Sequence, residues 1–305
     1  MTHRIRIASR ASMMAKAQVD WLRGQLAVRD RSVVTEFLPV TTEGDAWAGS
    51  LSGIGGKGAF TRAVEQSLMD GRAELALHCL KDVPGDIPIA ENTTLLFPAR
   101  GDVRDALVHG GGLRLDDLPD GTRIGTSGPR RAAQLRRRYP RLTPVPVRGN
   151  ADTRLGLVAA GTVDAVILSY EGLRRIGRAD EATQILEMNQ MLPAIGAGQL
   201  VMQVRAGDTN TLAAAGRLTD TSSTTAATAE RILLENLAGH CHAPIAGYAS
   251  VKEGIVNVTA SVWSPDGSQV ITTDASASSP QSAGWAAAHD LIGQGADALL
   301  SACRR

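Results

Sequence analysis

The feature that most constrains the fold of this chain is a strand-helix-strand order that recurs along most of its length. Residues 4–9 alternate as a strand, Ser12 can cap a helix that runs to residue 26, and residues 33–40 form a second strand. The order starts again at residue 102, with strands expected at 106–108, 122–125, 145–147 and 164–168. Because strands joined through helices run parallel with helices on both faces, the sequence predicts doubly wound α/β sheets with parallel strands.

The last part of the chain has a different pattern. A segment rich in Thr and Ser at 219–225 is interpreted as a linker. A helical pattern follows it, then short strands with a turn at 264–267, and a helix from residue 280. Strands joined by short turns predict a small antiparallel α+β unit at this end.

Arginine supplies nearly all of the positive charge, since Lys occurs only at positions 16, 57, 81 and 252. The net charge is only +1, yet eight arginines and a single acid, Asp152, lie between Arg130 and Arg154. Arginine binds carboxylate and phosphate in a bidentate manner, so this local excess predicts an anionic ligand. Nucleic acid is not expected to be that ligand, because only 3% of the residues are aromatic and the whole chain is near neutral.

Charged residues follow several of the expected strands. Open α/β sheets bind ligands at the carboxyl ends of their strands, where Arg10, Lys81 and Asp82 fall. Lys81 would bind a carboxylate of the ligand and Asp82 would transfer protons. The simpler alternative is that Lys81 and Asp82 form an ion pair on the surface that has no function. Further candidates at strand ends are Thr126, Ser127, Arg130, Arg131, Arg148, Arg154 and Arg175. A solvated helix face is the interpretation for Arg136, Arg137, Arg138 and Arg141.

Residues 42–58 form a long glycine-rich segment that includes Gly55, Gly56 and Lys57. It is not a phosphate loop of the P-loop type, because Lys57 is followed by Gly58 rather than by Ser or Thr. We interpret the segment, with Phe60 just beyond it, as a mobile lid, and a plain surface loop is the alternative.

Cys241 stands between His240 and His242, just after a long helical pattern. Neighbouring imidazoles favour the thiolate, which attacks carbon electrophiles, so covalent chemistry is one interpretation. An inert thiol and a zinc ligand are the alternatives. The sequence has no paired Cys-x-x-Cys and no His-x-x-x-His, so we expect no metal.

The chain shows no sign of export or membrane insertion. Its three cysteines are too few and too scattered for a disulfide framework. The first residues lack the apolar core of a secretory signal, and no run of eighteen apolar residues occurs. We therefore expect a cytosolic protein.

Taken together, these motifs resemble the hydroxymethylbilane synthase family, also called the porphobilinogen deaminase family. The resemblance extends from one end of the chain to the other. It is carried by segments 7–12, 55–58, 78–84, 125–127, 130–131, 148–154, 172–175, 192–194 and 239–245.

The resemblance implies three domains, of which the first two are similar to periplasmic binding proteins and the second is inserted in the first. The expected limits are 1–99 with 199–217 for the first domain, 100–198 for the second and 218–305 for the third. The first two would be doubly wound α/β domains, and the small α+β third domain would carry Cys241 facing the cleft between them.

The resemblance also implies the activity. Cys241 would carry a dipyrromethane cofactor, two linked pyrroles held in a thioether and never released. Four porphobilinogen units would be deaminated and joined head to tail onto it, and water would free hydroxymethylbilane. Asp82 is the expected general acid and base, with Lys81 beside it, and would stabilise the cationic azafulvene left when ammonia departs.

Each pyrrole bears an acetate and a propionate, so the growing chain would accumulate negative charge. The cofactor contacts implied by the resemblance come from Lys81, Asp82, Thr126, Ser127, Arg130 and Arg131. The implied substrate contacts come from Arg10, Ser12, Arg148, Arg154 and Arg175. The expected partner is the small-molecule substrate alone, with no nucleic acid and no membrane, bound by a monomer.

The chain departs from the family pattern at several positions. Gly128 and Pro129 replace two residues suited to substrate contact, Ala197 replaces Gln, Cys79 replaces Ser, and His240 and Ala246 replace Gly. Asp82 and the arginines are intact, so these departures do not imply loss of the reaction. The alternatives are a paralogue that serves another pyrrole pathway and a binding protein of the same fold that holds an anionic ligand without turning it over.

Overall fold

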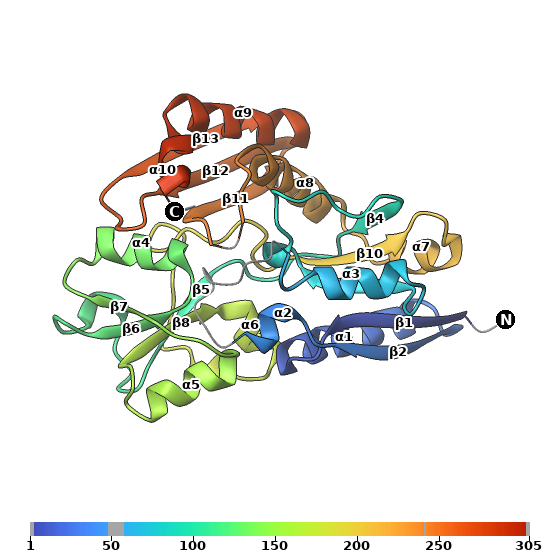
Figure 1. The fold of residues 1–305 in the computed structure, drawn as a ribbon, viewed down its shortest axis with the longest axis horizontal. Coiled ribbons are helices and arrows are strands. Elements are labelled where there is room, and N and C mark those ends of the chain that lie inside the picture. Colours follow the sequence, from blue (N-terminus) through green and yellow to red (C-terminus); the bar gives the residue numbers. More distant parts are fainter. Residues whose placement is uncertain (1–2, 48–57, 241, 303–305) are drawn as a thin grey trace.

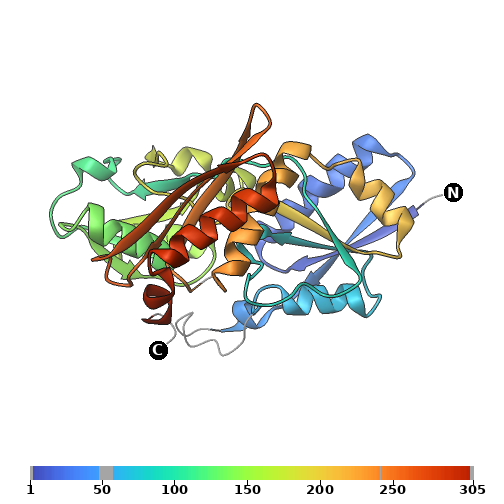
Figure 2. The ribbon, with the colours of Figure 1, turned by 90° about the horizontal axis from the view of Figure 1, so that it is seen from above.

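The computed structural model describes residues 3–47, 58–240 and 242–302. Within them, the chain forms two five-stranded sheets and one three-stranded sheet, each covered by helices (Figure 1). The two larger sheets lie beside each other along the long axis of the molecule, and the three-stranded unit lies over the second sheet and the junction between the two (Figure 1, Figure 2).

The first sheet has the strand order β2-β1-β3-β10-β4. Its strands are β1 (His3–Arg10), β2 (Val33–Val40), β3 (Leu75–Cys79), β4 (Thr93–Leu96) and β10 (Leu200–Arg205). The helices of this unit are α1 (Met13–Arg29), α2 (Glu43–Ala46), α3 (Arg62–Met69) and α7 (Thr209–Gly216). Ser12 caps α1 as predicted, with its Oγ accepting the Ala15 N–H at 3.3 Å.

The second sheet has the order β7-β6-β8-β5-β9. Its strands are β5 (Asp105–His109), β6 (Arg123–Thr126), β7 (Thr143–Pro146), β8 (Ala165–Ser169) and β9 (Gln184–Ile185). The helices of this unit are α4 (Pro129–Arg138), α5 (Ala151–Ala159) and α6 (Tyr170–Arg175). Buried Leu, Val, Ile and Ala side chains fill both faces of this sheet.

The expectation of parallel strands holds for only part of each sheet. β1 is parallel to β2 and β3, and β6 is parallel to β7 and β8. β10 is antiparallel to β3, and β5 is antiparallel to β8. Both reversed strands begin where a connection arrives from the other sheet, so Leu200 starts opposite Cys79 and Asp105 starts opposite Ser169. A strand that enters at the carboxyl edge of its neighbours must run against them.

The third unit is antiparallel, as predicted. Its sheet, β11-β12-β13, consists of β11 (Ile245–Lys252), β12 (Ile255–Trp263) and β13 (Val270–Ala277). One face is covered by α8 (Thr221–Asn236), α9 (Pro280–Gly293) and α10 (Ala296–Ala302). The fold class is therefore confirmed: two α/β units of the doubly wound type and a small α+β unit.

The interpretation of 219–225 as a linker is wrong, because α8 begins at Thr221. Asp220 caps this helix by accepting the Ser223 N–H at 2.7 Å. The hydroxyls that suggested a linker are satisfied inside the helix, since Thr224 and Thr225 donate to carbonyls one turn back.

The arginines at the end of α4 do more than form a solvated face. Arg136, Arg137 and Arg138 are exposed. Arg136 Nη1 nevertheless donates to Pro265 O at 2.8 Å, and Arg137 Nη1 donates to Ser268 O at 3.0 Å. These bonds hold the turn between β12 and β13 on α4, which attaches the third unit to the second.

Candidate active site

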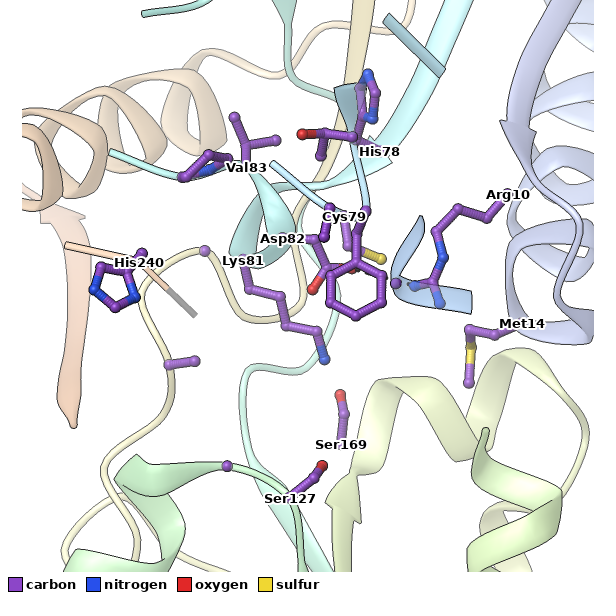
Figure 3. Close-up of a pocket in the computed structure, with 18 of the residues that line it drawn as sticks. Arg10, Met14, His78, Cys79, Lys81, Asp82, Val83, Ser127, Ser169 and His240 are labelled. Carbon is purple, nitrogen blue, oxygen red and sulfur yellow. Dashed lines mark ion pairs between the residues drawn. The ribbon is translucent and has the colours of Figure 1, made fainter. Parts of the chain in front are cut away.

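A cleft of about 1830 Å³ lies between the two larger sheets, where β1, β3, β6 and β8 end. Its lining comes from the loops that follow these strands and from the loop between α8 and β11 (Figure 3). This is the edge at which open α/β sheets bind ligands. Of the candidate ligand-binding residues that the structure describes, all line the cleft except Thr126, which is buried behind it.

Lys81 and Asp82 lie on a single 3₁₀ turn, Leu80–Asp82, that follows β3. Leu80 is 2% exposed, and its N–H donates to Gln199 O at 2.9 Å, which anchors the turn. The two charged side chains therefore point away from the anchor and into the cleft (Figure 3). Asp82 Oδ2 is 3.7 Å from Arg10 Nη1, whereas Lys81 has no ion pair with any residue that the structure describes.

Arg10 ends β1 and connects Asp82 to α2. Its Nε donates to both carboxylate oxygens of Asp45 at 3.2 Å, and its guanidinium lies 4.6 Å from the centre of the Phe60 ring. Burial would lower the pKa of Arg10, but the hydrogen bonds to Asp45 and the nearby charge of Asp82 raise it above its usual value. Arg10 is therefore a fixed cation with acids on two sides.

Arg130 and Arg131, in the first turn of α4, share one buried acid. Asp105 Oδ2 accepts from Arg130 Nη2 at 2.6 Å and from Arg131 Nε at 3.1 Å, and Asp105 Oδ1 accepts from Arg131 Nη2 at 2.6 Å. Each guanidinium also donates to a backbone carbonyl: Arg130 to Leu192 O and Arg131 to Ile167 O. Two cations with one counter-ion leave a net positive charge at this wall of the cleft.

Arg148 and Arg154 are cations without an acid partner among the described residues. Arg154 Nε donates to Gly149 O at 2.9 Å, and Arg148 Nη2 donates to Trp47 O at 3.2 Å. Burial, then the charges of Arg131 and Arg148, lower the pKa of Arg154 to about 10. Crowded cations of this kind indicate a wall built to receive an anion.

The other candidate residues have local partners. Arg175 Nε lies 3.2 Å from Glu171 Oε1, and Arg175 Nη2 donates to Gly198 O at 3.2 Å. Ser12 caps α1, and the Thr126 hydroxyl accepts the Gly128 N–H at 3.3 Å. Ser127 points into the cleft opposite Lys81 (Figure 3).

Cys241 and three residues of the predicted lid, Gly55, Gly56 and Lys57, lie outside the described residues. The neighbours of Cys241, His240 and His242, line the cleft with ring centroids 5.7 Å apart. The His242 N–H donates to His240 Nδ1 at 3.2 Å. Burial, then His240 and Arg148, lower the pKa of His242, so its imidazole is neutral near pH 7.

The described residues form neither a metal-binding cluster nor a membrane-spanning helix. Residues 3–47, 58–240 and 242–302 contain no cluster of three His, Cys, Asp or Glu side chains that could hold a metal ion. In the same part of the chain, no helix has the length and apolar content needed to cross a membrane.

The structure adds residues that the sequence reasoning missed. Asp105 and Asp45 hold the cleft arginines, and Glu171 pairs with Arg175. Ser169 ends β8 and points toward Lys81 from the opposite wall (Figure 3). Ser169 follows the expected strand at 164–168, which is the same signal that identified Lys81, but Asp105 is the first residue of its strand and had no such signal.

Fold and site together define a protein of two facing α/β units that binds an anionic ligand in the cleft between them. Comparison with known families makes the assignment more specific, and the chain belongs to the porphobilinogen deaminase family. The family model described as porphobilinogen deaminase, dipyromethane cofactor binding domain, matches residues 5–213. The model of the porphobilinogen deaminase C-terminal domain matches residues 224–293.

Curated relatives match over nearly the whole chain. Porphobilinogen deaminase 2 of Streptomyces coelicolor is 48% identical, over 97% of this chain and 96% of the relative. Porphobilinogen deaminase of Thiobacillus denitrificans is 39% identical, over 98% of this chain and 99% of the relative. Among solved structures, a TRAP periplasmic solute binding protein from Desulfovibrio salexigens gives a TM-score of 0.42 at 15% identity, over 72% of this chain and 73% of the other.

Proposed function

We propose that this chain catalyses the porphobilinogen deaminase reaction, in which four porphobilinogen units lose ammonia and join head to tail onto a dipyrromethane at Cys241, to be released as hydroxymethylbilane. Membership of the family supports this activity. The structural observation that supports it most is the distribution of charge in one cleft. The carboxylate of Asp82 lies on one side, and on the other side lie Arg148 and Arg154, which have no acidic partner among the described residues. The alternative of a binding protein has no comparable support, since the curated relatives are named as the enzyme.

The donor groups of the cleft fit a dipyrromethane. Two pyrroles bear four carboxylates, and Lys81, Arg148 and Arg154 have no acid partner within the described residues. Arg130 and Arg131, neutralised by only one carboxylate, add a further positive charge. When bound, the cofactor supplies the nucleophilic pyrrole carbon to which the first unit is added. The task of these side chains is to hold its carboxylates by charge-assisted hydrogen bonds.

Asp82 is the group that acts on the reacting substrate. Its carboxylate accepts hydrogen bonds from pyrrole N–H groups and stabilises the positive charge that develops on the substrate when ammonia leaves. The same carboxylate then accepts the proton that must leave the ring carbon once the new carbon–carbon bond has formed. Arg10, 3.7 Å away and fixed by Asp45, keeps this carboxylate oriented.

The domain limits remain a prediction, which the sheet memberships support. β1 to β4 and β10 form one sheet and β5 to β9 another, so the chain leaves the first unit near residue 99 and returns near residue 199. A cytosolic location, a monomeric state and the lack of a nucleic-acid partner also remain predictions.

The test is the intact mass of the purified protein, compared with Cys241→Ser and Cys79→Ser variants. We expect a mass excess equal to two pyrrole units in the wild type and in Cys79→Ser, because Cys79 is a half-buried thiol whose pKa is raised by burial and then by Asp82. The excess should be absent from Cys241→Ser. A wild-type protein that stays unmodified after incubation with porphobilinogen would contradict the proposal.

Asp82→Asn separates an enzyme from a binding protein in the same assay. The variant should keep the mass excess, because Cys241 and the cationic wall are unchanged, but lose most of its turnover, by about 10²–10⁴-fold. Turnover close to that of the wild type would show that Asp82 has no role in the reaction.

A further inference from the structure

The segment that follows Asp82 is held by the helix that leads to Cys241. Arg231, on α8, is 6% exposed, and its Nη1 donates to Val83 O at 3.0 Å and to Pro84 O at 2.9 Å. Its Nη2 donates to Glu235 at 2.6 Å. One guanidinium therefore fixes two consecutive carbonyls immediately after Asp82, and a fixed backbone there limits where the Asp82 carboxylate can lie.

A second bond ties the same two segments closer to Cys241. The Gly85 N–H donates to Gly239 O at 2.9 Å. A Cβ atom at Gly85 would lie 2.6 Å from Leu234 O, so the two backbones are in direct contact. In the other direction, the Val83 N–H donates to Leu80 O at 3.0 Å and closes the turn that carries Lys81 and Asp82.

These bonds form a continuous connection from the turn that carries Asp82 to the loop that carries His240 and His242, on either side of Cys241. Val83, Asp82 and His240 lie on the same side of the cleft, and the second sheet forms the opposite wall (Figure 3). The cleft volume of about 1830 Å³ is roughly twice the upper end for a drug-sized ligand, so it has room for a lengthening chain without separation of its walls.

We propose that Arg231 is a positioning residue that holds the Asp82 turn and the loop flanking Cys241 as one unit, so that Asp82 keeps a constant place relative to the attachment point through all four additions. This inference rests on the proposed function. The lengthening pyrrole chain then extends along the opposite wall of the cleft, which carries Arg148 and Arg154. The loop that flanks Cys241 does not move away from Asp82 as the chain grows.

The test follows single additions in Arg231→Met, which removes both carbonyl contacts, and in Arg231→Lys, whose ammonium can restore them. Primed protein is mixed with porphobilinogen, quenched at intervals, and weighed intact to give a rate for each of the four additions. Exchange of the Gly85 amide hydrogen is measured on the same proteins without substrate. Arg205→Met is the matched control, because Arg205 Nη1 also donates to two carbonyls, Leu68 O at 2.5 Å and Ala73 O at 2.7 Å, and does not line the cleft.

We expect Arg231→Met to keep the two-pyrrole mass excess, to exchange the Gly85 amide faster, and to slow all four additions by a similar factor, on the order of ten- to a hundredfold. Arg231→Lys should recover much of the rate. Slowing confined to the later additions, or unchanged rates with a loss of stability like that of Arg205→Met, would overturn the inference. If Arg231→Met does not fold, Arg231→Gln takes its place under the same criteria. A wild type without the mass excess would instead contradict the proposed function.

Discussion

Asp105 is the residue on which the cationic wall of the cleft depends. It is 3% exposed and lies between two guanidinium groups that would otherwise repel each other. Burial alone would raise the pKa of its carboxyl, but the charges of Arg130 and Arg131 hold that pKa well below its ordinary value. One buried acid thus allows two arginines to occupy the same helix turn beside the cleft.

Replacement of Asp105 by Asn should destabilise the protein strongly. The variant leaves two buried guanidinium groups without a counter-ion, so we expect the free energy of unfolding at pH 7 to fall by about 3–5 kcal/mol. Because the folded pKa lies below the unfolded value of about 3.9, the carboxylate stabilises the fold above that pH and ceases to do so as the pH falls through the folded pKa. The variant should therefore lose less stability than the wild type between pH 5 and acid pH.

Urea unfolding at several pH values measures both effects. Asp164→Asn is the control, because Asp164 also pairs with an arginine, Arg123 at 2.8 Å, but is 37% exposed. An exposed pair of this kind contributes at most about 1 kcal/mol. A loss for Asp105→Asn no larger than that for Asp164→Asn would show that Asp105 is not needed to balance the arginines.

For single residues, the sequence predicted which side chains line the cleft better than it predicted their ion-pair partners. Arg10, Lys81 and Arg131 could be placed in the cleft because the carboxyl end of a strand is defined by local pattern. Asp105 could not be identified, because it is distant in the sequence from Arg130 and meets it only through the pairing of β5 with β8. Partners that depend on strand order are not encoded in local periodicity.

Among the elements, the turn between β12 and β13 is held tightly against α4. Gly267 in this turn has φ +77°, and a Cβ atom there would lie 2.5 Å from Ala133 O. Gly254, between β11 and β12, has nearly the same φ, +78°, but no atom lies within 4 Å of its Cβ position. The two glycines therefore have nearly the same φ but differ in the contacts that a Cβ atom would make.

This difference predicts the effect of alanine at each site. Gly254→Ala should cost about 1–2 kcal/mol, the cost of a left-handed residue with a side chain. Gly267→Ala should cost about 1–3 kcal/mol more, because the turn must also move away from α4. Denaturant unfolding of both variants gives the two values. Equal losses would mean that the turn can shift off α4 freely and that Arg136 and Arg137 do not fix it.

The order and type of most elements could be predicted, and the directions of two strands could not. The 3.6-residue period identified α1, and the alternation of residues 4–9 identified β1. β5 and β10 have the same apolar character as parallel strands, so their reversal is not visible in the pattern. Direction follows from the point at which each chain connection enters its sheet, which is a property of the whole topology.

In the whole molecule, the three sheets are joined at one buried acid, Glu230 of α8. Its side chain is 0% exposed and accepts from Arg100 Nη1 at 2.7 Å and Nη2 at 3.1 Å. It also accepts the backbone N–H of Gly196 at 2.7 Å and of Ala249 at 2.7 Å. Arg100 and Gly196 lie on the two connections between the larger sheets, and Ala249 lies on β11, so this one carboxylate holds both connections against the third unit.

Glu230→Gln tests whether this junction determines the stability of the whole chain. The amide keeps the shape of the side chain but removes its charge, and it can accept at only one oxygen, so Arg100 and one backbone N–H lose a charged acceptor in a buried place. We expect the free energy of unfolding to fall by about 3–5 kcal/mol. Because the junction links all three units, we expect the wild type to unfold in one urea transition and Glu230→Gln to unfold in a broader transition or in steps.

Glu74→Gln is the matched control: Glu74 binds Arg6 at 2.6 Å and the Arg6 N–H at 2.7 Å, yet it lies within one sheet. That variant should lose stability with its transition still in one step. A Glu230→Gln transition as sharp as that of Glu74→Gln would mean that the three units are held together by their apolar contacts and not by this carboxylate.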